Sequence, residues 1–328
     1  MSSKHSTASR PSVGAESTPG DGLLEGLIID GSRGLYRVET AQGHYTCTIR
    51  GRLRKELIYA ESAGARKSVR QVNVKPHDPV AVGDRVRILP AGGASGVIEE
   101  VVARAGGAFS RRDPDPKQGS LRTVAGLDQI VPVFATREPE PHLGLLDRFL
   151  VVAEAQRMAA IICITKADLG VDPWLVERLN VYRSIGYPVV LTSVATWEGI
   201  EDLRARLAGK TSALVGKSGV GKSSLLNALE PGFGQRVSEV SMATGKGRHT
   251  TTGTRLFPLS GPAGGYIADT AGIRALGLDR ETERVLDRCF PEFARYLGQC
   301  ALADCTHTHE PDCAVREAVA MGSIDGLR

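Results

Sequence analysis

The sequence predicts a multidomain α/β protein with three folded parts in a row. Short runs rich in β-branched and aromatic residues fill 23–105 and predict a small β-barrel or sandwich. Strand and helix patterns alternate over 106–275, which is typical of a doubly wound sheet with helices on its faces. Residues 276–328 are predicted to be helical and contain a cluster of cysteines and histidines. A tail of Ser, Thr, Pro and Gly residues at 1–22 is expected to be disordered.

Length and composition fit this division and limit the classes of function. The chain has 328 residues, of which 41% are hydrophobic and 24% charged, enough for several domains with separate cores. The net charge of +4 fits an RNA partner without requiring one. No apolar run reaches the ~20 residues that span a bilayer, and no secretory segment is recognisable. We expect a cytoplasmic protein without membrane contact; a transit peptide is the alternative interpretation of the basic tail.

The first part is predicted from its strands and turns. The strand-like runs are LLEGLIID, GLYRVET, HYTCTIRGRL, DRVRILP and SGVIEEVVAR, separated by Gly-rich turns. Basic residues fall mostly between these runs, where they form either solvated loops or a face that contacts phosphates; composition does not separate the two. These residues are Arg50, Arg52, Arg54, Lys55, Arg66, Lys67 and Arg70.

The second part alternates between buried strands and amphipathic helices. The strand runs are QIVPVFA, AAIICIT, PVVLTSV and SALVG, and the helical runs are LGLLDRFLVVAEAQRM, PWLVERLNVYRSIG, IEDLRARLAG and KSSLLNALE. Asp172 and Pro173 are expected to open the second helix as cap and first-turn residue. TRLFPLS and GGYIADT follow as a predicted strand pair. In such a sheet, ligands bind beyond the carboxyl ends of the strands.

A phosphate loop lies between the strand SALVG and the helix KSSLLNALE. Its sequence GKSGVGKS fits the pattern G-x-x-x-x-G-K-[ST], in which backbone N–H groups and a helix start surround an anion. Lys222 is expected to reach the β- and γ-phosphates, Ser223 to ligate Mg²⁺, and Ser224 to lie near the α-phosphate. The nucleotide-binding residues expected here are Gly216, Lys217, Ser218, Gly219, Val220, Gly221, Lys222, Ser223 and Ser224.

The segment TKAD, at the end of a buried strand, predicts that the base is guanine. A carboxylate accepts both the N1–H and the exocyclic amine of guanine, whereas adenine would leave it unpaired. Asp168 is therefore the expected specificity residue, and Lys166 is expected along the base plane. Thr165 stands where Asn is usual and can replace only part of its hydrogen bonding. The expected base-binding residues are Thr165, Lys166, Ala167 and Asp168, with Thr192, Ser193 and Val194 near the guanine O6.

The stretch between the phosphate loop and DTAG has the composition of a nucleotide-dependent switch. Asp269 is expected to hold Mg²⁺ through water and the Gly272 N–H to sense the γ-phosphate. Thr251 is the favoured switch ligand to Mg²⁺, with Thr250 and Thr252 as alternatives. Many GTPases carry a water-orienting Gln just after this motif. Here that residue is Ile273, so His249 is the candidate to position water, its alternative role being an exposed switch residue.

The C-terminal part carries a predicted metal site. QCALADCTHTHEPDC places Cys300, Cys305 and Cys313 around two histidines, His307 and His309, either of which completes a set of three thiolates and one imidazole. Such a set binds Zn²⁺ tetrahedrally and leaves no position for water, which indicates a structural site. Three buried free cysteines are the alternative interpretation.

The order of these motifs resembles one family. TKAD before GKSGVGKSS, then GRHTTT, DTAG and C-x4-C-x-H-x5-C, is similar to the small ribosomal subunit biogenesis GTPases of the RsgA or YjeQ type, which are circularly permuted GTPases. The resemblance covers about 23–328. It implies an N-terminal OB-fold, a circularly permuted P-loop GTPase domain with a doubly wound sheet, and a C-terminal helical zinc-binding domain. It also implies that the zinc ligands are Cys300, Cys305, His307 and Cys313.

The same resemblance implies a function. Members act in late maturation of the small ribosomal subunit, and the subunit stimulates their GTP hydrolysis. We therefore expect GTP and GDP, the small subunit and its rRNA as partners, and a monomer. Ala271 stands where the family usually has Pro, and Thr165 where it has Asn. The alternatives are a non-ribosomal RNA-binding P-loop NTPase, an ATPase or kinase acting on a small molecule, and a non-hydrolysing RNA-binding protein.

Overall fold

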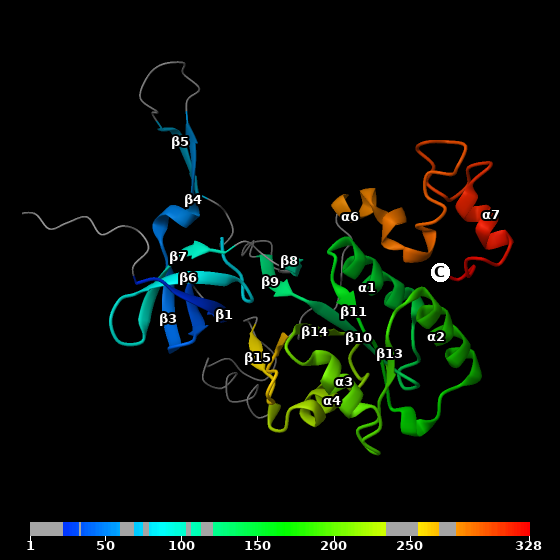
Figure 1. Ribbon diagram of the computed structural model, residues 1–328, viewed down its shortest axis with the longest axis horizontal. Coiled ribbons are helices and arrows are strands. Elements are labelled where there is room, and N and C mark those ends of the chain that lie inside the picture. The colour runs from blue at the N-terminus through cyan, green and yellow to red at the C-terminus, as the bar shows by residue number, and fades with distance from the viewer. Residues whose placement is uncertain are drawn as a thin grey trace, which may run out of the picture.

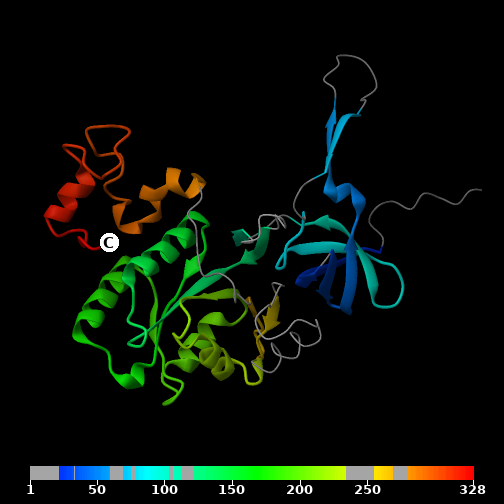
Figure 2. The same cartoon turned by 180° about the vertical axis from the view of Figure 1, so that it is seen from behind.

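A computed structural model shows three parts arranged in a line, with the barrel at one end and the C-terminal part at the other (Figures 1 and 2). The structure describes residues 22–32, 34–59, 69–74, 79–102, 106–112, 121–233, 255–268 and 280–328. The predicted tail at 1–22 falls outside these residues except for Gly22. Among the described residues, no helix is both long and apolar enough to cross a membrane.

The first part is a closed five-stranded barrel with the strand order of an OB-fold. The order is β1-β2-β3-β7-β6, and β6 closes the barrel by pairing antiparallel with β1. Strands β3 and β7 pair in parallel, which requires the chain to cross the barrel between them. The strands are β1 (Leu24–Ser32), β2 (Leu35–Thr40), β3 (Gly43–Ile49), β6 (Arg85–Pro90) and β7 (Ser95–Val101). Apolar side chains that alternate along them are fully buried inside: Ile28, Val38, Cys47, Val86, Ile88 and Ile98.

The crossing between β3 and β6 contains a strand pair that was not expected, while Arg50, Arg52 and Arg54 lie between strands as predicted. The short helix η1 (Gly51–Arg54) follows β3, and a strand pair then projects from the barrel, formed by β4 (Lys55–Tyr59) and β5 (Val69–Val74) (Figure 1). Lys55 and Arg70 therefore belong to strands, while Arg66 and Lys67 lie outside the described residues. The alternation in this crossing is too short to be recognised among its Gly and Ser residues.

The second part confirms the predicted doubly wound sheet. It is seven-stranded, in the order β13-β12-β10-β14-β16-β15 with β11 beside β10, and all pairs are parallel except β15 with β16. From β10 the chain continues through β12 to β13 at one edge of the sheet. Strand β14, which leads into the phosphate loop, then pairs with the other side of β10. The strands are β10 (Gln129–Ala135), β11 (Ala159–Ala160), β12 (Ile162–Thr165), β13 (Val189–Leu191), β14 (Thr211–Val215), β15 (Leu256–Pro258) and β16 (Tyr266–Ala268).

Among the described residues, two helices cover each face of this sheet. Helices α1 (Leu143–Ala155) and α2 (Pro173–Ile185) pack on one face, and α3 (Ile200–Leu207) and α4 (Lys222–Leu229) on the other. Neighbouring residues of β10 go to opposite faces, since Ile130 packs with α1 and α2 whereas Val131 packs with α3 and α4. Both faces are buried, and for this reason the strand sequences read as continuous apolar runs. Asp172 precedes α2 as expected but pairs with Arg137 at 3.1 Å instead of capping the helix.

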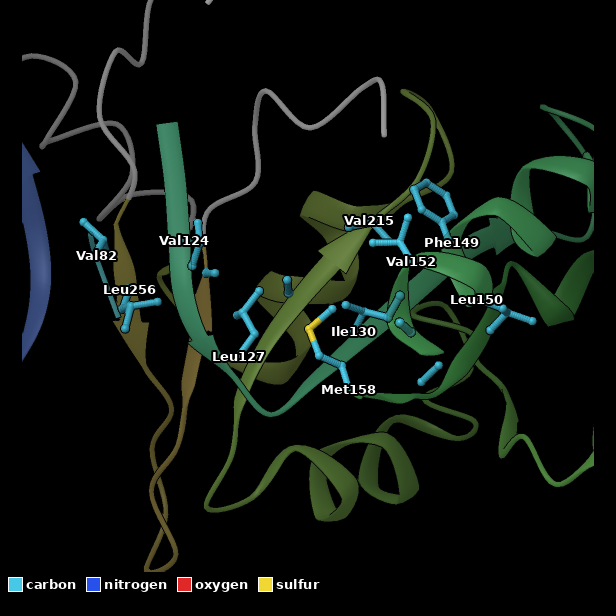
Figure 3. Packing of buried hydrophobic residues seen from close by; sticks show 14 of the residues in the cluster. Val82, Val124, Leu127, Ile130, Phe149, Leu150, Val152, Met158, Val215 and Leu256 are labelled. Carbon is cyan, nitrogen blue, oxygen red and sulfur yellow. The ribbon is translucent and has the colours of Figure 1, made fainter. Parts of the chain in front are cut away.

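One continuous hydrophobic core joins the barrel to the sheet. Strand β9 (Leu121–Leu127), paired with β8 (Gly107–Arg112), runs almost directly into β10 and brings Val124 against Val82. Figure 3 shows the buried row from Val82 and Leu256 to the residues of α1. An ion pair between Arg255 and Asp30 and a 3.0 Å hydrogen bond from the Tyr266 hydroxyl to Glu39 add polar contacts.

The C-terminal part packs on α1 and α2 (Figure 2). It is helical as predicted, but its helices are short: α6 (Arg280–Arg284), η3 (Leu286–Cys289), η4 (Pro291–Phe293) and α7 (Ala314–Ala320). The Arg328 side chain is only 3% exposed and pairs with Asp147 of α1 and, at 2.7 Å, with Glu292 of η4. Arg178 of α2 holds Asp325 at 2.7 Å. These charge pairs fasten the last turn of the chain to the sheet domain.

At Gly83 the backbone of the barrel lies very close to the backbone of β9. Substitution of this glycine therefore tests the contact between the barrel and the sheet domain. Its φ is +93°, and a Cβ atom there would lie 2.0 Å from the Ala125 carbonyl oxygen. Gly83→Ala is expected to destabilise the barrel by about 2–3 kcal/mol, since it adds a backbone clash to a strained φ. Gly92→Ala is the matched control, with φ +103° and nothing within 4 Å, and should cost about 1 kcal/mol. Urea unfolding followed by circular dichroism gives both values; equal losses would contradict the packing argument.

Candidate nucleotide and metal sites

The phosphate loop follows β14 at the centre of the sheet and leads into α4. Gly216 has φ +152°, and a Cβ atom there would lie 2.3 Å from the Val133 carbonyl oxygen, so only glycine fits against β10. The Lys222 ammonium donates to the carbonyl oxygens of Gly216 and Lys217 at 2.7 and 2.6 Å. This lysine therefore lies across the loop, where the phosphates of a bound nucleotide are expected.

The TKAD segment follows β12, two strands away from β14 across β10. The Thr165 hydroxyl lies 3.1 Å from the Phe134 carbonyl oxygen and 2.5 Å from that of Val220 in the phosphate loop. A hydroxyl has a single proton, so the shorter contact is the better candidate for its donated bond. The described contacts of Thr165 are thus with the phosphate loop and β10, and a contact with the base stays a prediction.

Asp168 and Ser193 meet at the same edge of the sheet. The Ser193 hydroxyl donates to Asp168 Oδ1 at 2.5 Å and accepts the Thr196 N–H at 3.1 Å. Asp168 is exposed, while Thr192 and Ser193 are fully buried beneath it. Each carboxylate oxygen has two lone pairs, so the bond from Ser193 orients Asp168 and leaves both oxygens able to accept from a guanine edge.

The loop between β10 and α1 carries contacts that the sequence reasoning missed. The Thr136 hydroxyl donates to the Lys166 carbonyl oxygen at 2.9 Å, and the Lys166 ammonium donates to the Glu138 carbonyl oxygen. Lys166 itself has φ +59°. No sequence motif marks this loop. The available signal was its position after the carboxyl end of a central strand, where such sheets bind their ligands.

The residues of the predicted switch lie outside the described residues. They are His249, Thr251 with its alternatives Thr250 and Thr252, Asp269, Gly272 and Ile273. The last described residue before DTAG is Ala268, which ends β16 beside β14. The role of Asp269 therefore stays a prediction.

In the C-terminal part, the structure shows which of the two histidines lies beside the three cysteines. The ligand atoms of Cys300, Cys305, His307 and Cys313 all lie within 4.8 Å of one another. His309 instead contacts the Thr308 hydroxyl through Nδ1 at 2.9 Å. The pattern of three cysteines and His307 is thus the one that the fold assembles, and this cluster could hold a metal ion.

The spacing within the cluster fits a tetrahedral metal. Metal bonds of about 2.3 Å to sulfur and 2.0–2.1 Å to nitrogen give tetrahedron edges of about 3.8 Å between sulfurs and about 3.6 Å between sulfur and nitrogen. The Sγ atoms of Cys300 and Cys313 are 3.9 Å apart. His307 Nδ1 lies 3.5 Å from the first and 3.4 Å from the second. These three donor atoms therefore already have the mutual spacings that such an ion requires, and the Cys305 Sγ lies within 4.8 Å of each of them.

The pKa values in the cluster show why a cation suits it. Desolvation and hydrogen bonds with its neighbouring thiols raise the pKa of Cys305 to about 12. Desolvation also opposes ionisation of Cys313, but backbone donors and His307 outweigh it and lower that pKa to about 7. Three adjacent thiols cannot all ionise without a positive charge between them, and a bound metal supplies that charge.

Glu310 organises the loop that carries His307. Its carboxylate accepts the backbone N–H groups of Thr306, Thr308 and His309 at 2.8, 3.0 and 3.1 Å, and also the Thr306 hydroxyl at 2.5 Å. These donors lower the pKa of Glu310 well below its usual range. His307 has φ +62°, a conformation that needs such support. Sequence reasoning missed this residue, since its partners are backbone groups.

Taken together, a phosphate loop and a guanine-reading segment in reversed chain order, between an OB-fold barrel and a cysteine–histidine cluster, define a circularly permuted P-loop GTPase. Comparison with known proteins agrees. The model of the RsgA GTPase family matches residues 108–279, and the chain belongs to this family. It is therefore a GTP hydrolase.

Individual relatives cover nearly the whole chain. A small ribosomal subunit biogenesis GTPase RsgA from Gemmatimonas aurantiaca is 44% identical over 91% of this chain and 92% of its own. One of the same name from Moorella thermoacetica is 38% identical over 92% of each chain. The crystal structure of YjeQ from Thermotoga maritima aligns with a TM-score of 0.69 at 33% identity, covering 93% of this chain and 94% of that one. The circularly permuted GTPase YloQ aligns with a TM-score of 0.64 at 28% identity, covering 95% of this chain and 93% of its own.

Removing the Glu310 carboxylate should weaken metal binding without removing a ligand. Glu310→Ala is expected to lower Zn²⁺ affinity by about 10–100-fold, because the loop then no longer holds His307 in place. Competition with a chromogenic chelator measures the affinity. Glu317→Ala, which removes an exposed carboxylate from α7, is the matched control and should match wild type. Equal zinc affinity in the two variants would show that the loop needs no such anchor.

Proposed function

We propose that this protein acts in small ribosomal subunit biogenesis, hydrolysing GTP during late maturation of the subunit, which in turn stimulates the hydrolysis. The observation that carries the proposal is the reversed order of the two nucleotide motifs between a barrel and a metal cluster. Relatives named small ribosomal subunit biogenesis GTPase align over 92% of their own length, which supports the proposal. The expected setting is the bacterial cytoplasm, with the protein as a monomer.

In this proposal, GTP binds at the carboxyl edge of β10, β12 and β14. The phosphate loop wraps the phosphates, and Asp168 reads guanine in the orientation that Ser193 gives it. Ser223, Thr251 and Asp269 would hold Mg²⁺, which would supply positive charge against the β- and γ-phosphate oxygens. His249 positions the attacking water, since Ile273 has no group that could. We expect slow turnover in isolation, with the subunit completing the site.

The metal proposed for the C-terminal cluster is one structural Zn²⁺. Its ligands are Cys300, Cys305, His307 and Cys313, and the four donors leave no position for water. The core around them is small, with Cys313, Val315, Ala318 and Ile324 as its buried residues. A metal contributes most to stability where the apolar core is this thin.

The barrel is proposed to contact rRNA. Arg50 and Arg52 share one carboxylate, that of Glu99, although both arginines remain more than half exposed. Two guanidinium groups on one acid leave a net positive charge at the base of the projecting β4–β5 pair. A net positive charge attracts phosphate groups. For this reason we interpret these arginines as part of a face that contacts phosphates.

GTP turnover with purified small ribosomal subunits tests the proposed function. We expect slow turnover alone and a severalfold or greater increase with subunits, and no increase when ATP replaces GTP. Lys222→Ala, which removes the ammonium from the phosphate loop, should abolish turnover under both conditions. Unchanged GTP turnover of the wild-type protein at saturating subunits would contradict the proposal.

Asp168→Asn tests the guanine assignment. The variant loses a charge-assisted bidentate pair of about 3 kcal/mol, so GDP affinity should fall by about 100-fold. Xanthosine diphosphate should bind better than GDP, since an amide can donate to the xanthine oxygen that replaces the amine. Competition binding with both nucleotides measures the exchange. Ser193→Ala, which only releases the carboxylate, should weaken GDP without reversing the preference; a variant that keeps its preference for GDP would exclude Asp168 as the reader.

A further inference from the structure

A hollow of about 380 Å³ lies beside the phosphate loop, and Lys217 is the one residue that lines it among those expected to bind the nucleotide. Helix α1 supplies one side, through Gly144, Leu145 and Arg148, and His142 precedes that helix. Lys217 of the phosphate loop forms the other side. A Cβ atom at Gly144 would lie 3.5 Å from the His142 ring, so the absence of a side chain there keeps the space beside the imidazole open.

Three basic side chains surround this hollow, and nothing described neutralises them. His142, Arg148 and Lys217 are exposed, and within the described ranges none of them forms an ion pair. The neighbouring acid on α1, Asp147, accepts hydrogen bonds from Arg328 and from the Tyr182 hydroxyl instead. Glu138 and Glu140 lie on the preceding loop but do not line the hollow. The arginines of the barrel, by contrast, already share Glu99.

We propose that this hollow binds a backbone phosphate of small-subunit rRNA. The proposal rests on the function proposed above and adds a contact site on the sheet domain, separate from the barrel. Cationic groups around a small apolar floor, formed by Leu145, suit a phosphodiester with its adjoining ribose. The occupant touches Lys217, which lies in the phosphate loop between Gly216 and Ser218. RNA bound here therefore contacts the same loop as the nucleotide.

The salt dependence of subunit binding tests this site in the full-length protein. Each phosphate contact contributes about 0.7–0.9 to the slope of log affinity against log salt concentration. Arg148→Gln should lower that slope by this amount and weaken binding severalfold, whereas Arg148→Lys should keep the slope because it keeps the charge. Arg183→Gln removes an exposed arginine from α2, where its partner is Asn180, and is the matched control.

Naked small-subunit rRNA and inorganic phosphate serve as further probes. The slope change of Arg148→Gln should recur with naked rRNA; its presence with subunits only would assign the hollow to an acidic protein surface and overturn the proposal. Millimolar phosphate at constant ionic strength should not displace the RNA, and displacement that disappears in Arg148→Gln would indicate a free-anion site instead. If wild type binds subunits and Arg148→Gln keeps its slope, this inference fails alone. If wild type does not bind subunits, the proposed function fails with it.

Discussion

Strand β10 is the element on which the nucleotide site depends, because both motif-bearing strands pair with it. Its register with β12 and β14 brings the TKAD segment and the phosphate loop to one edge of the sheet. The close contact of the Thr165 hydroxyl with the Val220 carbonyl oxygen then joins the two loops directly. Pairing of strands in space does not depend on their order along the chain, so circular permutation leaves this site intact.

The same strand connects the site to the rest of the molecule. β9 continues toward the barrel, where Val124 meets Val82, and α1, which follows β10, receives the C-terminal part through Asp147 and Arg328. The hollow beside Lys217 opens at the start of α1. The barrel, the nucleotide loops and the part that carries the metal cluster are therefore all attached to β10, to the segments next to it in the chain, or to the strands that pair with it.

Most of the sheet and the site's chemistry could be predicted because their signals are local. The runs QIVPVFA and SALVG are strands as predicted, and the phosphate loop stands between a strand and a helix. The strand pairs β4–β5 and β8–β9 were not predicted, since their residues alternate too weakly and lie among Gly, Ser and charged residues. The roles of Thr136 and Glu310 could not be predicted either, because their partners are backbone groups that only the folded chain brings near.

Residue type and short spacing were enough to predict the class of chemistry. They indicated a phosphate loop, a carboxylate that selects guanine, and thiol ligands for a metal. The tertiary structure alone decided which of two histidines joins the cysteines, that Thr165 contacts the phosphate loop, and that β3 and β7 close the barrel in parallel. It also decided that Lys217 lies beside His142 and Arg148, so that three basic side chains surround one hollow. The physical reason is the same in each case: these contacts depend on how the folded backbone is placed, and that geometry exists only once packing has fixed the backbone.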